Sequence, residues 1–310
     1  MTPGSQDVSA IASVALAAHL GRMSWPTFLI TIALLLAPLD GVRAQPTGAE
    51  PKRGDTYELI LTRDMVQRDN LGGRGSSHDQ DTLIERVLDA RVDGLELEYD
   101  FPREAAAQGR SSEWHFPARV FKPPLGPVLL LNRAELEARV DGWLKSGGMT
   151  RTNCGQVIFT WNAFLIDCDP QSVIGMIQRF DLTSTKVREG ALYLDPNAAG
   201  PARLTKGPSG GTLVAHMAVD PDAVRRGRAE TEVGVAKLMR QPLTLEDALR
   251  ERAKDTVSGS ISVRFETLPA GAVRRRTTVT KFEIRRPDGR LETRTITETL
   301  ERRLVPTRES

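Results

Sequence analysis

ISVRFETLPAGAVRRRTTVTKFEIRRPDGRLETRTITETL, residues 261–300, is the strongest β-strand signal in the chain. Apolar and polar residues alternate along it, and a period of two is typical of strands that bury one face. The alternation is interrupted at 268–271, which contains Pro and Gly, and at 287–289, which reads Pro-Asp-Gly; both are typical of tight turns. The stretch therefore predicts a C-terminal three-stranded antiparallel meander. Its face rich in Arg, Lys, Glu and Thr is expected to be exposed to solvent.

Two segments nearer the N-terminus repeat this alternation. Residues 57–62 and 92–99 place apolar and polar side chains on opposite faces, so we expect a strand in each. Between them, residues 69–81 read DNLGGRGSSHDQD, which is polar and rich in glycine. This composition is typical of loops, and we expect a mobile loop there.

The clearest helix signal lies at residues 132–144. Leu136 and Val140 fall on one face at helical spacing, and Asn132 followed by Glu135 matches a capping box at the N-terminus. Further helices are expected at 170–180, 221–239 and 244–253. Together these elements predict an α+β fold, with a large, mostly antiparallel sheet and a few helices packed on one side.

An apolar run, TFLITIALLLAPL at residues 27–39, has the length of a signal-peptide core. It is shorter than the roughly 20 apolar residues that cross a bilayer. The small residues Val42 and Ala44 predict cleavage after Ala44, and translation starts at either Met1 or Met23. The alternative is a membrane anchor that is never cut.

This cleavage site suggests a division of the chain, with no stable membrane span left in the mature protein. We expect a signal peptide at 1–44, a flexible lead at 45–54 and a single α+β domain at 55–310. Export of this kind places the mature protein in the periplasm or outside the cell.

The chain has two cysteines, Cys154 and Cys168, and both follow the predicted cleavage site. An even number of cysteines in an exported protein predicts a disulfide. Because the Cα atoms of a disulfide lie within about 7 Å of each other, the apolar segment between them must reverse, most simply as a hairpin near 161–163. The alternative is two buried free thiols. Two thiols without a nearby His provide only half of a zinc site, so we expect no metal.

The charge balance argues against nucleic acid as a partner. The chain has 42 basic and 40 acidic residues, a formal net charge of +2. Two short basic clusters, 225–228 and 274–276, have acidic neighbours and lack interleaved aromatic residues. We therefore interpret both as solvated faces and expect no nucleic-acid site.

Candidate catalytic groups are few. His115 follows Glu113 at a spacing that shares one strand face, and His78 precedes Asp79. Either His/carboxylate pair could act as a base with its orienting group in a secreted hydrolase. The chain lacks the Gly-x-Ser-x-Gly motif of a nucleophile elbow, and it also lacks the motif of a phosphate-binding loop. No motif predicts a cofactor.

Aromatic residues suggest a different kind of site. Trp114, Trp143 and Trp161 could line a groove between the sheet and its helices. We therefore expect an exported cell-envelope protein, not an enzyme, that binds an apolar small molecule or another envelope protein. The alternative is the hydrolase described above.

Overall fold

The computed structural model describes residues 51–103, 113–159, 163–182, 187–268 and 271–306. The predicted signal peptide and residues 45–50 of the predicted lead lie outside the described residues. At the start of the described chain, the backbone N–H of Gly54 donates to the carbonyl of Val87, which joins the end of the lead to the sheet.

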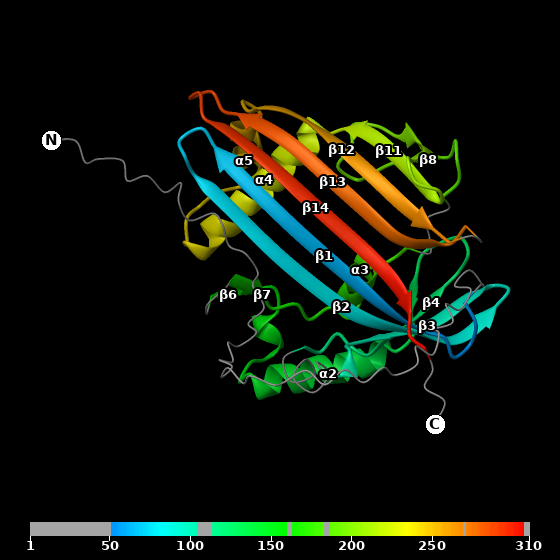
Figure 1. Ribbon diagram of the computed structural model, residues 1–310. Helices are drawn as coiled ribbons and strands as arrows, with labels where there is room; N and C mark the ends of the chain where they lie inside the picture. Colours follow the sequence, from blue (N-terminus) through cyan, green and yellow to red (C-terminus); the bar gives the residue numbers. More distant parts are fainter. Residues whose placement is uncertain (1–50, 104–112, 160–162, 183–186, 269–270, 307–310) are drawn as a thin grey trace, which may run out of the picture.

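A ten-stranded antiparallel sheet dominates the structure, in the order β10-β11-β12-β13-β14-β1-β2-β3-β4-β5 (Figure 1). Its strands are β1 (Thr56–Asp69), β2 (Arg74–Arg91), β3 (Gly94–Asp100), β4 (Ala118–Lys122), β5 (Leu129–Leu130), β10 (Thr205–Lys206), β11 (Thr212–Ala218), β12 (Thr256–Thr267), β13 (Val273–Arg285) and β14 (Leu291–Leu304). Two small pairs lie outside it: β6 (Val157–Phe159) with β7 (Ala163–Leu165), and β8 (Leu192–Tyr193) with β9 (Ala202–Arg203). The predicted α+β class with a large antiparallel sheet is confirmed.

The C-terminal meander is confirmed as β12, β13 and β14, which pair in sequence order. The sheet continues through β14 into β1, so the last and first strands of the described chain are neighbours near its middle. Their register runs from Tyr57 opposite Leu304 to Asp69 opposite Glu292. This pairing places the first and last strands side by side, which the sequence pattern did not predict.

The prediction of a loop at 69–81 was wrong for most of that segment. The turn occupies only the residues between Asp69 and Arg74, and β2 begins at Arg74. The polar half of β2 pairs with the polar half of β1, for example His78 with Asp64. Because both faces are polar at this end, no hydrophobic alternation marks the strand, although the backbone ladder is complete.

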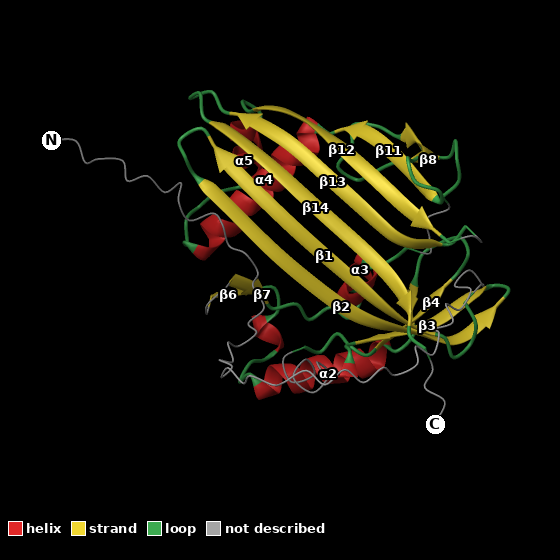
Figure 2. Cartoon of the chain, viewed as in Figure 1, coloured by secondary structure: helices red, strands yellow, loops and turns green. Residues whose placement is uncertain are grey.

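The helices α2 (Arg133–Ser146), α3 (Ser172–Arg179), α4 (Pro221–Leu238) and α5 (Leu245–Arg252) confirm the helical predictions. Figure 2 shows α3, α4 and α5 behind one face of the sheet, while α2 lies near β2, β3 and β4. A 3-10 turn, η2 (Arg151–Asn153), follows α2. None of the described helices is long and apolar enough to cross a membrane.

Capping by Asn132 was predicted wrongly. Its side-chain oxygen accepts a hydrogen bond from the backbone N–H of Arg119, not from the first turn of α2. Asn132 therefore ties the start of α2 to strand β4. By contrast, Thr244 caps α5, since its side chain accepts from the backbone N–H of Asp247.

We call the helix-covered face of the sheet the inner face and the opposite one the outer face. At one end of β1, the inner-face residues Leu59 and Leu61 are buried. They belong to one cluster with Leu136 of α2 and Ile177 of α3. Burying such a side chain stabilises the fold by roughly 1.5–3 kcal/mol, so this apolar end holds the helices on the sheet.

Candidate functional site

A cavity of about 750 Å³ lies between the inner face and helices α3 and α4. Strands β1, β13 and β14 contribute its floor, because alternate residues of each strand point to the same face. Gly175, Gln178 and Arg179 of α3 and residues 223–232 of α4 contribute walls, together with the segment 193–197.

The cavity begins where the inner face changes from apolar to polar. Along β1, the buried Leu59 and Leu61 are followed on the same face by Arg63, Met65 and Gln67. Of these three, Arg63 and Gln67 line the cavity. At this end, polar residues are interspersed among apolar ones on the inner face, and a space lies under the helices where the other end has a packed core.

Apolar side chains form one part of the lining. Phe282 and Ile296 lie on the floor, Val224 lies on α4 and Val219 lies just before it. Tyr193 also lines the cavity, with its ring centroid 5.1 Å from that of the buried Phe265. Burial raises the pKa of the Tyr193 phenol, so this hydroxyl is neutral at physiological pH.

Charged side chains form the other part. The lining arginines and acids are Arg63, Arg179, Arg228, Arg276, Arg286 and Arg294, with Asp195, Glu232, Glu292 and Glu298. Arginines outnumber acids, so the lining carries a positive excess.

Glu292 binds two arginines at one end of the cavity. One of its carboxylate oxygens accepts from Arg228 of α4 and the other from Arg294 of β14, each at 2.8 Å. Burial alone would raise the pKa of Glu292, but the charges and hydrogen bonds of these two arginines outweigh burial and lower it. Glu292 is therefore ionised, and it links α4 to the sheet.

The basic clusters at 225–228 and 274–276 were predicted to be solvated faces, and for two of their residues this was wrong. The side chains of Arg228 and Arg276 are only 15% and 19% exposed and line the cavity. The helical position of Arg228 and the inner-face register of Arg276 turn them inward. Neither position could be read from charge alone.

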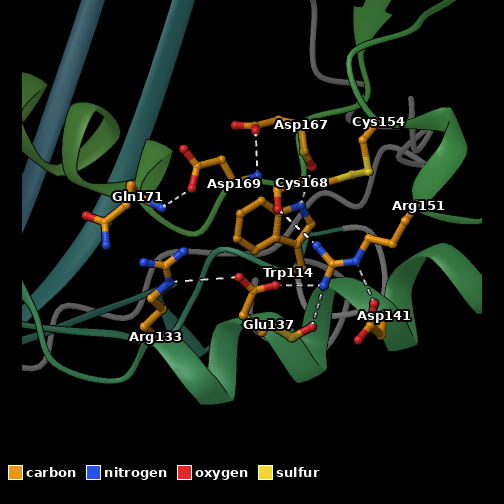
Figure 3. A network of polar contacts seen from close by, with 10 residues as sticks. All are labelled: Trp114, Arg133, Glu137, Asp141, Arg151, Cys154, Asp167, Cys168, Asp169 and Gln171. Atoms are coloured by element: carbon orange, nitrogen blue, oxygen red, sulfur yellow. Dashed lines mark hydrogen bonds and ion pairs between the residues drawn. A yellow bond between two sulfur atoms is a disulfide. The ribbon is translucent and has the colours of Figure 1, made fainter.

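The disulfide between Cys154 and Cys168 is confirmed, with Cα atoms 5.7 Å apart. Strands β6 and β7 pair antiparallel, as the predicted reversal requires. Figure 3 shows Arg151 beside this bond, where it contacts Glu137 and Asp141 of α2, each at 2.7 Å. The disulfide segment is thereby attached to α2.

Two of the three tryptophans predicted to line a groove, Trp114 and Trp143, do not line this cavity. Trp114 is buried, and its indole N–H donates to the carbonyl of Asp167 near the disulfide (Figure 3). Trp143 lies on α2 and packs against the core. Trp161 lies outside the described residues. Their role in ligand binding therefore stays a prediction.

The structure also places the candidate catalytic histidines. His115 Nδ1 lies 2.8 Å from Glu113 Oε2, and its Nε2 lies 3.9 Å from Asp167 Oδ2. His78 Nδ1 lies 2.6 Å from Asp64 Oδ1, whereas Asp79 belongs to the other face of β2. The described residues contain no cluster that could hold a metal ion. The hydrolase alternative stays a prediction.

No protein-family model and no curated protein matches the chain. Among solved structures, lipovitellin, described for its lipid–protein interactions, is similar over 84% of this chain with a TM-score of 0.31 and 9% identity. The chain spans 26% of lipovitellin's length. A dehydratase domain from the CurJ module of curacin polyketide synthase reaches a TM-score of 0.11 at 9% identity, over 79% of this chain and 75% of that domain. Scores this low do not indicate a shared fold.

Proposed function

We propose that this protein is a non-enzymatic binding protein that holds a partly apolar small molecule between its sheet and helices. The observation that carries the proposal is the cavity of about 750 Å³ lined by Phe282, Ile296 and Val224. Small-molecule sites typically have volumes of roughly 300–1,000 Å³ and polar groups that orient the ligand. This cavity has such a volume and combines apolar residues with charged ones.

The same proposal includes the setting in which the protein works. A disulfide is stable in an oxidising compartment and rare in the cytosol. Together with the apolar run at 27–39, it supports export followed by cleavage after Ala44. The mature protein then acts in the periplasm or outside the cell.

Filling the cavity tests the proposal. Thr280 of β13 lies on the floor opposite Ile296, and Thr280→Trp places an indole where the ligand would lie. We expect this variant to bind the uncharged dye Nile red at least tenfold more weakly than the wild type, because ligand and indole compete for one volume.

Thr297→Trp is the matched control, because Thr297 lies on β14 opposite Val279, on the outer face. We expect it to bind the dye as the wild type does. Circular dichroism and the melting temperature show that each variant is folded. Equal dye binding by folded Thr280→Trp and wild type, or no binding by the wild type, would overturn the proposed function.

A further inference from the structure

One end of the cavity carries three arginines for one carboxylate. Arg228 and Arg294 share Glu292, as described above. Arg286 lines the same cavity just after β13, two residues beyond Ile284, which is paired with Glu292. Among the described residues, no carboxylate lies within 4.0 Å of the Arg286 guanidinium. This end therefore has positive charge that the described residues do not neutralise by contact.

Two donors at this end also lack acceptors. The Nε atoms of Arg228 and Arg294 are buried and have no hydrogen-bond partner in the described structure. A buried N–H without an acceptor costs free energy, and native structures usually satisfy such groups. An anionic oxygen is the acceptor that guanidinium groups bind best, often through two hydrogen bonds at once.

The opposite end of the cavity carries charges of both signs. Arg276 approaches Glu298 at 3.6 Å. Arg63 lies between Glu298 of β14 and Asp79 of β2 in the sheet register. Among the described residues that line the cavity, the buried donors without acceptors thus lie at the end near the β13–β14 turn, at the rim of the sheet.

An apolar surface begins directly beside this charged end. Phe282 is paired with Arg294, whose guanidinium lies 5.6 Å from the ring centroid. The next inner-face pair toward the core is Thr280 with Ile296. A molecule with one acidic group at the rim would therefore place its apolar part over Phe282 and Ile296.

Building on the proposed function, we propose that the ligand is an acidic amphiphile whose carboxylate or phosphate group is bound by Arg228, Arg286 and Arg294. Its apolar part lies along the cavity floor. The same chemistry also fits a free phosphate, so the test must separate an amphiphile from an isolated anion.

The test compares matched ligands on the full chain. We expect the wild type to bind a long-chain alkyl phosphate or carboxylate about tenfold more tightly than the alcohol of equal length, the effect of one charge-assisted hydrogen bond. Arg286→Gln should reduce this preference and leave binding of the alcohol unchanged. Calorimetry or competition with Nile red measures each affinity.

Arg264→Gln is the matched control, because Arg264 is an exposed arginine on β12 that faces outward and has no ion-pair partner among the described residues. It should keep the wild-type preference. If inorganic phosphate binds as tightly as the alkyl phosphate, the ligand is a free anion and the proposal of an amphiphile is overturned.

If the wild type binds the acid no more tightly than the alcohol, as Arg286→Gln does, this inference is overturned and the proposed function still stands. Failure of the alcohol, the acids and the dye to bind the wild type would overturn both.

Discussion

At the scale of single residues, Glu292 links the helix wall of the cavity to its floor. It receives Arg228 from a helix and Arg294 from a strand, and its side chain is only 11% exposed. Without this carboxylate, the two guanidinium groups would repel each other across the α4–sheet contact.

We predict that Glu292→Gln lowers the free energy of unfolding by about 2 kcal/mol at pH 7, the cost of leaving buried charged donors poorly paired. The pKa of Glu292 is lowered in the folded protein, so its stabilising effect is present above the unfolded-state pKa. The effect is lost as the pH falls through the folded-state pKa. Urea unfolding at pH 7 and pH 3 measures it.

The difference between wild type and Glu292→Gln should therefore shrink at pH 3. A difference of equal size at both pH values would show that the carboxylate charge is not responsible. The same comparison made for Thr297→Gln, on the outer face, controls for a general effect of substitution on β14.

The residue scale is also where sequence reasoning missed the site. Cys154 and Cys168 were paired correctly because two cysteines allow only one bond within the chain. Arg228 and Arg294 come from α4 and β14, 66 positions apart, and meet only because tertiary packing lays the helix over the strand. A usable signal existed in β1, where Arg63 and Gln67 continue the buried face of Leu59 and Leu61.

At the scale of elements, the disulfide secures the segment between α2 and α3. Its cysteines are 14 positions apart. We predict that the free energy of unfolding of the double variant Cys154→Ser, Cys168→Ser is about 3 kcal/mol lower than that of the wild type. This is the loop-entropy value for roughly 15 residues. Urea titration with and without a reducing agent measures this loss.

Reduction should destabilise the wild type by a similar amount and leave the double variant unchanged. Loss of stability in the double variant on adding the reductant would mean that the agent acts elsewhere. An unchanged wild type after complete reduction would mean that the bond contributes nothing to stability.

Close packing of β12 on β13 gives a second prediction at this scale. A Cβ added at Gly259 would lie 2.3 Å from the Lys281 carbonyl oxygen and 2.9 Å from Phe282 Cα. Since backbone cannot move aside cheaply, Gly259→Ala should destabilise the protein by about 1–3 kcal/mol. Thermal unfolding measures the change.

Gly142 of α2 is the matched control, because an added Cβ there meets nothing within 4 Å. Gly142→Ala should stabilise the protein by about 0.5–1 kcal/mol, as expected for replacing glycine within a helix. A stability for Gly259→Ala equal to or above that of the wild type would contradict the described β12–β13 packing.

Elements with strong local signals were predictable, and those without were not. The meander and the helices follow from periodicity and turns that lie within each segment. The first half of β2 was predicted as a loop because both of its faces are polar and glycines precede it. Its pairing with β1, which is a tertiary property, determines its structure.

At the scale of the whole molecule, one long sheet serves two purposes. Its apolar end packs a core against the helices, and its polar end leaves a cavity under α3 and α4. The sequence predicted the class of fold, but not that β14 lies beside β1 in the sheet. Strand order of this kind depends on contacts between distant segments, which periodicity does not report.

The occupancy of the cavity can be measured directly by native mass spectrometry of the full chain, purified from the producing cells without detergent. We predict a protein that begins at Gln45, keeps its Cys154–Cys168 bond and carries an acidic amphiphile that Thr280→Trp lacks. A wild-type protein without a bound molecule, and still without one after incubation with a long-chain carboxylate, would contradict the account.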